Sequence, residues 1–436
     1  MKRQFPQLSE LRPLLQFSRP SLDRRSARLA GAADINDLRT IARRRTPRPA
    51  FDYVDGAAGQ ELTARRTREA FASTEMLPRI LHGTAAADLS VRIAGITSAL
   101  PFGIAPTGFT RFMHAEGEDG GAAAAAAAGI PFSLSTMGTR SLEQVAEVSD
   151  AVGNEERGAP GSRWFQLYLW KDRERSLDLI QRAQAAGFGT LMVTVDTPVA
   201  GQRLRDVRNG MTIPPKLSLK TVVDASYRPE WWFNFLTTDP LTFASLSNTA
   251  TDLPSLINGM FDPTLSIRDL EWIRGAWPGR LFVKGVLTAE DARRSLDAGA
   301  DGLIVSNHGG RQLDRAPVSL KALTEVRAEA GPDVEIILDS GITSGADIVA
   351  ALALGADFTL IGRAYLYGLM AGGRAGVARA IELLAEETRV AMMLMGAASV
   401  ADLQGSGQVR APWLTAEPAG SGAPDPSSAS RPARRN

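Results

Sequence analysis

The stretch LIVSNHGGRQLD, residues 303–314, passes from an apolar run directly into polar and glycine residues. Its first three residues suit a strand that is buried on both faces, as in a parallel sheet that helices cover. The residues that follow include His308, one of three histidines in the chain, between an asparagine and a glycine pair. A core strand that ends in this way indicates that its end reaches a functional surface.

The same pattern recurs along the chain, and each apolar run is followed by a helical pattern. The expected strands are LPFGIAPT (100–107), IPFSLST (130–136), WFQLYLW (164–170), TLMVTVDTP (190–198), LFVKGVLT (281–288), the opening stretch, EIILDSG (335–341) and FTLIGRA (358–364). The runs are continuous rather than alternating, which favours parallel strands. Eight strand–helix units predict an α/β protein with a (β/α)8 TIM barrel, and a doubly wound open sheet is the alternative.

Three segments lie outside this repeat. Residues 1–33 are basic and are expected to form a mobile N-terminus. We place the barrel domain at residues 34–396, with an N-terminal helical segment and a long insertion after the fourth strand, at about residues 205–262. Residues 397–436 form a C-terminal extension. Most of it is expected to be a disordered tail, because Pro, Ser, Gly and Ala dominate its second half.

Composition narrows the class of protein. A net charge of +1 over 436 residues gives no electrostatic reason to expect nucleic acid as a partner. The chain has no cysteine, which removes disulfides, thiolate nucleophiles and Cys-based zinc sites, and we expect no metal centre. The longest apolar run, residues 122–132, is well short of the roughly 20 residues that span a bilayer. We therefore expect a cytoplasmic protein.

The polar residues at the strand ends indicate the chemistry, since barrel enzymes build their sites there. One such residue alone is more often a solvated loop residue, but here eight strand ends behave alike. His308 is a candidate general base at neutral pH, and Asp196 is a candidate to orient it and stabilise its cation. Arg203 and Arg311 offer forked donors that suit a bidentate pair with a carboxylate.

A second group of residues suits a phosphate. Asp339, Ser340 and Gly341 end the seventh expected strand, and Gly362 and Arg363 end the eighth. The loops after these two strands are the usual phosphate site of such barrels, where backbone N–H groups and a helix N-terminus bind the anion. Taken alone, glycines in each loop could equally serve only to turn the chain.

Several motifs resemble the FMN-dependent 2-hydroxy-acid dehydrogenase and oxidase family, which includes glycolate oxidase, mandelate dehydrogenase and L-lactate dehydrogenase. They are SNHGGRQLD, FQLYLWKD, TVDTP with Arg203 six residues after Thr197, VKGVLTAEDAR and ALALGADFTLIGRAYLYGL. The likeness covers roughly residues 35–396. IAPTGFTRFMHAEGE, STMGTR, LRDVRNG and WWFNFLTT are most similar to the bacterial L-lactate dehydrogenases that pass electrons to a quinone.

The resemblance implies FMN as the cofactor, a homo-oligomer of tetramer type and a role for each matching residue. It makes His308 the base and Asp196 its partner, with Tyr168 facing the substrate oxygen and Lys284 beside the flavin ring. The implied substrate-binding residues are Tyr53, Tyr168, Arg203, His308 and Arg311. The implied flavin and phosphate contacts are Thr107, Gly108, Ser135, Gln166, Thr194, Lys284, Ser306, Asp339, Ser340, Gly341, Thr343, Gly362 and Arg363.

Two positions qualify these implications. Many family members carry arginine where this chain has Thr343, so the phosphate loses one charge-assisted contact and must depend on Arg363 and backbone donors. Gly108 resembles the dehydrogenases more than the oxidases, which often carry alanine, although lactate monooxygenases also have glycine.

Three functions remain open at this point. The first is FMN-dependent oxidation of a small L-2-hydroxy acid, L-lactate above all, with electrons passed to a quinone. The second is an oxidase or monooxygenase of glycolate, mandelate or lactate type that uses oxygen. The third is a barrel that binds a phosphorylated ligand without turnover, against which the set of site residues argues.

The insertion suggests a further partner. Its cluster Trp231, Trp232, Phe233 and Phe235 stands beside Arg228, and such clusters suit either a packed lid or subunit contact or a membrane interface. An acceptor dissolved in lipid and the basic N-terminal residues (Lys2, Arg3, Arg12, Arg24, Arg25 and Arg28) favour peripheral binding to the inner face of the cell membrane.

Overall fold

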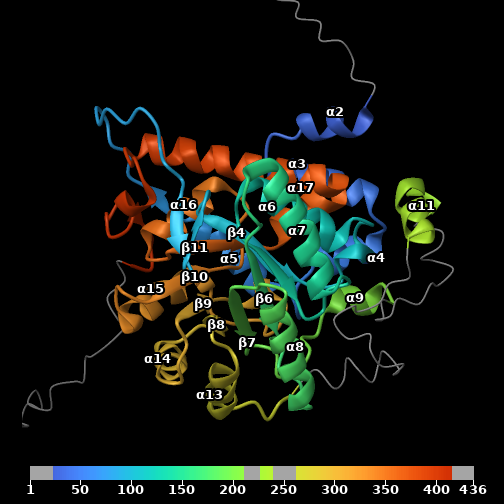
Figure 1. Ribbon diagram of the computed structural model, residues 1–436. Helices are drawn as coiled ribbons and strands as arrows, with labels where there is room; N and C mark the ends of the chain where they lie inside the picture. Colours follow the sequence, from blue (N-terminus) through green and yellow to red (C-terminus); the bar gives the residue numbers. More distant parts are fainter. Residues whose placement is uncertain (1–22, 211–225, 239–261, 415–436) are drawn as a thin grey trace, which may run out of the picture.

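The computed structural model describes residues 23–210, 226–238 and 262–414, and its centre is a closed barrel of parallel strands (Figure 1). The barrel strands are β4 (Phe102–Thr107), β5 (Phe132–Ser135), β6 (Arg163–Leu167), β7 (Thr190–Thr194), β8 (Arg280–Val286), β9 (Gly302–Val305), β10 (Glu335–Leu338) and β11 (Phe358–Ile361). Pairing of Leu360 with Gly103 joins β11 to β4 and closes the barrel. The (β/α)8 prediction is confirmed, and the open-sheet alternative is wrong.

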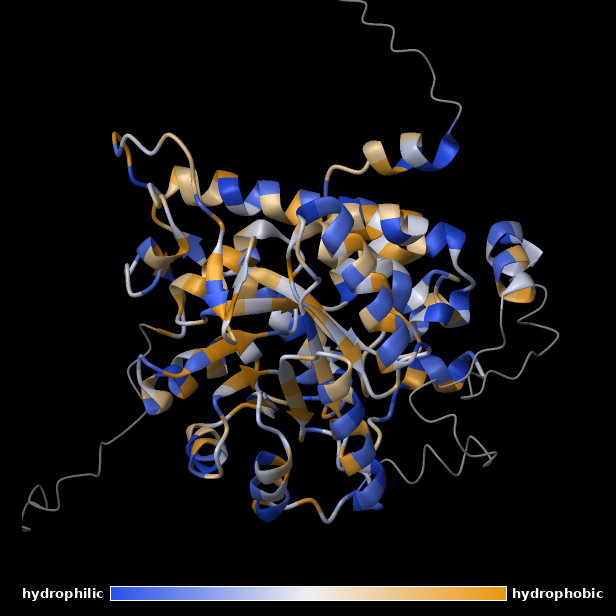
Figure 2. Ribbon diagram, in the orientation of Figure 1, coloured by the Kyte–Doolittle hydropathy of each residue, from blue (hydrophilic) through white to orange (hydrophobic). Residues whose placement is uncertain are grey.

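Helices cover the outside of the barrel, as the continuous apolarity of the strands requires (Figure 2). They are α6 (Gly117–Ala128), α7 (Leu142–Arg157), α8 (Arg173–Ala185), α13 (Ile267–Ala276), α14 (Ala289–Asp297), α15 (Ser319–Ala330), α16 (Gly345–Ala353) and α17 (Arg363–Leu394). Local signals set their ends: Ser141 and Gln144, for example, form a reciprocal capping box at the start of α7.

The barrel interior is filled at the amino-terminal ends of its strands. Trp164, Phe282 and Phe358 are almost fully buried there, and the ring of Trp164 stacks on Phe282 at a centroid distance of 6.4 Å. A hairpin of β2 (Val91–Ile93) and β3 (Ile96–Ser98) adds the buried Ile93 to the same cluster. The apolar filling leaves only the carboxyl ends of the strands for polar chemistry.

The segments before and after the barrel pack together. Helices α2 (Arg24–Ala30) and α3 (Ile35–Arg45) lie against α17, followed by α4 (Arg48–Asp55) and α5 (Leu62–Ala72). Residues 23–33, for which we expected a mobile chain, thus include a helix with Leu29 buried. In the C-terminal extension, η4 (Val400–Asp402) is followed by β12 (Val409–Arg410), which pairs with β1 (Glu75–Met76). The expected tail from residue 416 lies outside the described residues.

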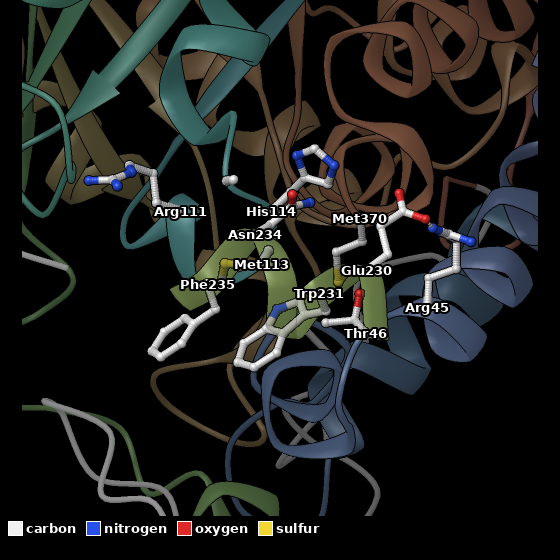
Figure 3. Close-up of a pocket in the computed structure, with 11 residues that line it drawn as sticks. Arg45, Thr46, Arg111, Met113, His114, Glu230, Trp231, Asn234, Phe235 and Met370 are labelled. Carbon is white, nitrogen blue, oxygen red and sulfur yellow. Dashed lines mark ion pairs between the residues drawn. The ribbon is translucent and has the colours of Figure 1, made fainter. Parts of the chain in front are cut away.

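The insertion after β7 contains α9 (Leu204–Arg208) and α11 (Pro229–Thr237) among its described residues. Trp231 of α11 packs on the barrel through Phe112: the two rings lie edge to face at a centroid distance of 6.0 Å, and the Trp231 Nε1 donates to the Phe112 carbonyl at 3.1 Å. Within α11, the Trp231 ring stacks on Phe235 at 4.9 Å (Figure 3). Phe233, by contrast, is 68% exposed. Of the two alternatives for the aromatic cluster, packing on the barrel therefore holds for Trp231, and a membrane-facing role for this residue does not. No helix in the described ranges is long and apolar enough to cross a bilayer.

Candidate active site

One large cavity opens at the carboxyl ends of the barrel strands, with a volume of about 2100 Å³ that includes the solvent at its mouth. It is lined by every predicted site residue except two. The lining predicted residues are Tyr53, Thr107, Gly108, Ser135, Gln166, Tyr168, Thr194, Arg203, Lys284, His308, Arg311, Asp339, Ser340, Gly341, Thr343, Gly362 and Arg363. Asp196 and Ser306 are the exceptions, and they lie behind His308 and Lys284.

His308 and Asp196 form the pair that the sequence predicted. The Nδ1 of His308 lies 3.0 and 3.2 Å from the two carboxylate oxygens of Asp196, which leaves Nε2 for the cavity. Burial would raise the pKa of Asp196, but the neighbouring charges of His308 and Lys284 offset it and hold that pKa below its ordinary value. A side chain at position 285 would clash with Asp196, since a Cβ on Gly285 would lie 2.7 Å from the Cβ of Asp196.

The backbone around His308 is held in an uncommon conformation. His308 has a φ of 57°, in the left-handed region, and Gly309 and Gly310 that follow it have φ of 64° and 73°. The Oγ of Ser306 accepts a hydrogen bond from the His308 N–H at 3.0 Å. This tight turn directs the imidazole back toward the barrel mouth, and such local strain is characteristic of functional sites.

Three further side chains form a group in the cavity wall with two positive charges. The guanidinium carbons of Arg203 and Arg311 lie 5.1 and 4.9 Å from the ring centroid of Tyr53. Burial, together with the charges of Arg203 and Arg363, lowers the pKa of Arg311 to about 10, so the guanidinium remains charged at neutral pH. Two positive forks beside a phenol suit a carboxylate.

Tyr168 lies in the same part of the cavity and carries a protonated hydroxyl. Burial, followed by the charge of Asp196, raises the pKa of Tyr168 well above its ordinary value. Tyr168 can therefore donate a hydrogen bond to an oxygen atom of a bound molecule at any pH near neutrality.

Lys284 places a buried positive charge in the cavity wall. Its Nζ lies 2.6 Å from a carboxylate oxygen of Asp339 and donates to the Oγ of Ser306 at 2.9 Å. Ser340 donates to the other Asp339 oxygen at 2.8 Å. A buried charge costs free energy unless it is paired, and the ion pair with Asp339 offsets that cost for the Lys284 ammonium.

Two buried polar atoms of the cavity wall have no hydrogen-bond partner in the part of the chain that the structure describes. They are Nε2 of Gln166 and Oγ1 of Thr194. The Oε1 of Gln166 is occupied, since it accepts from Ser135 at 2.8 Å. An unpaired buried polar group costs about 1–3 kcal/mol, so these two atoms favour a polar ligand in the cavity.

The other end of the cavity suits a phosphate. Helices α16 and α17 both begin there, and Ser340 and Gly341 have positive φ of 80° and 90°. Helix N-termini and exposed backbone N–H groups attract anions. Arg363, expected to bind the phosphate, donates to the carbonyls of Val54, Gly56 and Gly309 at 2.8–3.0 Å.

Thr343 does not replace the missing arginine. Its N–H and Oγ1 both donate to the Asp347 carboxylate, at 2.8 and 3.2 Å. Arg68 of α5, which the sequence reasoning missed, lies at this end of the cavity. Its Nη1 lies 2.7 Å from Asp347 and 2.5 Å from the carbonyl oxygen of Gly341.

Other cavity residues also escaped prediction, Met113 and Met137 among them. Met113 and Met137 line the wall beside Gly108, and a Cβ on Gly108 would lie 2.4 Å from the Cβ of Met137. Both methionines follow the first two barrel strands within a few residues, and this position in the sequence was the one sign that they could line the cavity. Apolar residues at such positions are hard to distinguish from ordinary core.

Comparison with known proteins agrees with this geometry. Residues 42–410 match the FMN-dependent dehydrogenase family. A Mycobacterium tuberculosis protein named "Putative L-lactate dehydrogenase" is 55% identical over 403 residues, which is 92% of this chain and 95% of the relative. An L-lactate dehydrogenase of Ectopseudomonas mendocina is 41% identical over 374 residues, covering 84% of this chain and 96% of the relative.

A solved structure supports the same relationship. A crystal structure described as the monotopic membrane protein (S)-mandelate dehydrogenase superposes with a TM-score of 0.80 at 34% identity. The match covers 87% of this chain and all of that one. The barrel, the cavity at its mouth and the sequence match over nearly the whole chain lead to one conclusion: this chain belongs to the FMN-dependent dehydrogenase family, and its cofactor is FMN.

Proposed function

We propose that the protein oxidises a small L-2-hydroxy acid, L-lactate to pyruvate, in the cavity at the barrel mouth and passes the electrons to a quinone. The observation that carries the proposal is that the His308–Asp196 pair and the Tyr53–Arg203–Arg311 group line or adjoin one cavity. A base and a carboxylate-binding group at one site are what a 2-hydroxy acid requires.

Each residue has a chemical task in this reaction. Arg203 and Arg311 bind the substrate carboxylate, with Tyr53 beside them. Tyr168 donates to the substrate oxygen, and Nε2 of His308 takes a proton while Asp196 stabilises the resulting cation. When bound, FMN supplies the acceptor for the two electrons that leave C2 of the acid. The ammonium of Lys284 favours the negative charge that accompanies them.

The cofactor fits the remaining wall of the cavity. Gln166 and Thr194 bring unpaired polar atoms that suit the polar edge of a flavin ring, together with Ser135, Thr107 and Gly108. Residues 339–343 with Gly362 and Arg363 suit the phosphate. Ser306 acts through the Lys284 ammonium to which it is bonded.

The deciding experiment follows the flavin. We expect a yellow purified protein whose absorbance near 450 nm, a typical flavin band, is bleached by L-lactate under anaerobic conditions. Parallel reactions with glycolate and (S)-mandelate define the acid. Bleaching by no hydroxy acid would favour the non-catalytic barrel. Reoxidation faster by oxygen than by a soluble quinone would favour the oxidase.

We further propose that the protein binds a membrane peripherally through α11. The described residues of this region expose Phe233 and Leu236, at 68% and 71%, and Tyr227 at 75%. Apolar and aromatic side chains on a helix beside Arg228 suit an interface with lipid headgroups. The solved (S)-mandelate dehydrogenase is described as monotopic, which supports such a surface.

Liposome co-sedimentation tests this second proposal. The parent protein should pellet together with vesicles that contain anionic lipid. A double variant, Phe233→Ser with Leu236→Ser, should stay in the supernatant. Val390→Ser removes an exposed apolar side chain from α17 and serves as the matched control, which should pellet like the parent. Equal pelleting of parent and α11 variant would contradict the proposal.

A further inference from the structure

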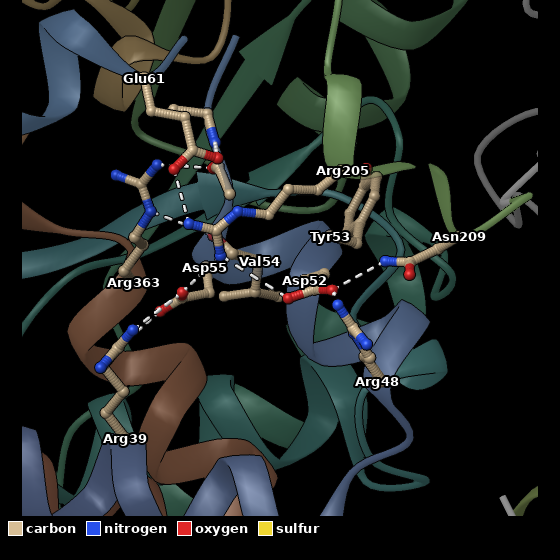
Figure 4. A network of polar contacts seen from close by, with 12 residues as sticks. Arg39, Arg48, Asp52, Tyr53, Val54, Asp55, Glu61, Arg205, Asn209 and Arg363 are labelled. Atoms are coloured by element: carbon tan, nitrogen blue, oxygen red, sulfur yellow. Dashed lines mark hydrogen bonds and ion pairs between the residues drawn. The ribbon is translucent and has the colours of Figure 1, made fainter. Parts of the chain in front are cut away.

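A cluster of ion pairs links the start of the insertion to the helix that carries Tyr53 (Figure 4). Arg205 of α9 lies at its centre. Its Nη1 lies 2.9 Å from Asp55 and 3.6 Å from Asp52, and its Nη2 lies 2.6 Å from Glu61. One guanidinium thus joins α9 to both ends of the segment that contains Tyr53.

Asp55 is the buried anchor of this cluster, with a side chain that is 5% exposed. Arg39 donates to both of its oxygens, at 2.5 and 2.9 Å, and the Tyr367 hydroxyl donates at 2.8 Å. Helices α3, α4, α9 and α17 therefore meet at one carboxylate. A buried charge with this many donors is held in one geometry, because losing a partner would leave it uncompensated.

The position of Arg205 relates directly to the substrate group. Arg203 stands two residues earlier and contacts the Tyr53 ring, whereas Arg205 contacts the carboxylates that flank Tyr53. The Nε of Arg203 lies 3.1 Å from a carboxylate oxygen of Asp206, and this ion pair fixes the direction of the guanidinium. Asn209 adds a bond to Asp52 at 2.8 Å from the end of α9. The short helix is tied to α4 at both of its ends.

We propose that Arg205 is a positioning residue for substrate recognition: it holds α9 onto α4 and thereby keeps Arg203 and Arg311 against Tyr53. This rests on the proposed function, since it takes those two arginines as the ligands of the substrate carboxylate. Arg205 itself contacts the carboxylates of Asp52, Asp55 and Glu61 rather than the substrate group. Its loss should weaken binding of the acid and leave the chemical step nearly unchanged once the acid is bound.

The test uses the FMN-loaded enzyme in anaerobic stopped-flow experiments with L-lactate, and oxalate as a non-reacting carboxylate probe. For Arg205→Ala we expect the half-saturating lactate concentration and the oxalate Kd to rise about 10-fold, a coupling of ordinary size between contacting residues. The limiting rate of flavin reduction should stay within about twofold of the parent. Arg205→Lys keeps the charge but not the fork, so it should give intermediate values.

Two controls separate positioning from general stability. Arg208→Ala removes an exposed arginine from the same helix and should change neither constant. Glu61→Gln weakens one Arg205 contact, and combining it with Arg205→Ala should add little to the single Arg205 variant. The double variant thus tests whether both substitutions act through the same contact.

The outcomes distinguish the two proposals. If Arg205→Ala lowers FMN content and thermal stability but leaves both constants at parent values, Arg205 is merely structural and the inference fails. If Arg205→Ala does not fold, the same comparison made with Glu61→Gln decides. If the parent is not reduced by lactate but its oxalate Kd still rises in Arg205→Ala, the inference stands and the proposed reaction fails.

Discussion

His308 is the residue on which the proposed chemistry depends most. His308→Asn should keep the protein folded and yellow, because asparagine tolerates the positive φ of 57° better than most residues. Without the base, flavin reduction by L-lactate should slow by at least ~10²-fold, the low end of a general-base contribution. Stopped-flow reduction measures this directly. A variant reduced at the parent rate would remove His308 from its role.

Arg311 allows a pH-dependent test of carboxylate binding. Burial and the charges of Arg203 and Arg363 lower the pKa of Arg311 to about 10, so its positive charge is present below that pH and is lost above it. A lysine has a lower ordinary pKa and loses its proton sooner in the same surroundings. Arg311→Lys should therefore bind oxalate more weakly than the parent, by an amount that grows from pH 6 to pH 9. A constant ratio across that range would contradict this account.

At the level of single residues, the sequence could place residues at strand ends in one cavity, while their roles stay predictions. Parallel strands end at one face, so strand-end residues such as Lys284 and His308 could be brought together without knowing any side-chain geometry. Asp206 and Arg68 could not be found in this way. They lie on helices outside the strand ends, and their relevance depends on which way a helix turns toward the cavity.

Among the elements, α4 shows how a buried acid stabilises the frame of the site. Burial would raise the pKa of Asp55, but donors from Arg39, Tyr367 and Arg205 hold it below its ordinary value of 3.8. The stabilisation by Asp55 is therefore fully present above pH 3.8 and is lost as pH falls through the lowered pKa. The free energy of unfolding of Asp55→Asn should fall furthest below that of the parent at neutral pH, and the difference should shrink as the pH falls below 4.

Urea unfolding between pH 3 and pH 7 measures this difference. Asp52→Asn, in the same helix but with fewer bonds, is the comparison variant and should show a smaller effect at every pH. A deficit for Asp55→Asn that is independent of pH would mean that packing, rather than charge, is what the substitution removes.

The insertion shows where the sequence left the prediction of elements open. Its four aromatics were assigned together to a lid, an interface or a membrane surface, yet α11 buries Trp231 and exposes Phe233. A helix that packs on a barrel and a helix that lies on a membrane both need an apolar face, so composition cannot separate them. The direction of each residue around α11 depends on contacts with Phe112, which is distant in sequence.

For the whole molecule, the barrel could be predicted because its signals are local and repeated eight times. The pairing of β1 with β12 could not, since each strand has two residues and the partners lie more than 330 positions apart. Such a contact leaves no periodic pattern in the sequence, and it can contribute to stability only once the whole fold has assembled. The homo-oligomer stays a prediction, which sedimentation analysis of the purified protein can test.

The position of the domain end leads to a final prediction. We placed the end of the barrel domain at residue 396, but Val400, Leu403 and Val409 beyond it are buried, and Gln408 donates to the carbonyls of Leu77 and Met395. Burying one such apolar side chain contributes about 1.5–3 kcal/mol. A chain that ends at residue 396 should therefore melt at least about 5 °C below the full-length protein.

A chain that ends at Leu414 keeps all of these contacts and should melt with the full-length protein, which makes it the matched control. Scanning calorimetry of the three chains, each loaded with FMN, gives the comparison. Equal melting temperatures for the chains ending at 396 and 414 would mean that the extension only covers the barrel. A lower value for the shorter chain alone would extend the folded domain to β12, because the buried side chains and the Gln408 bonds lie between the two ends.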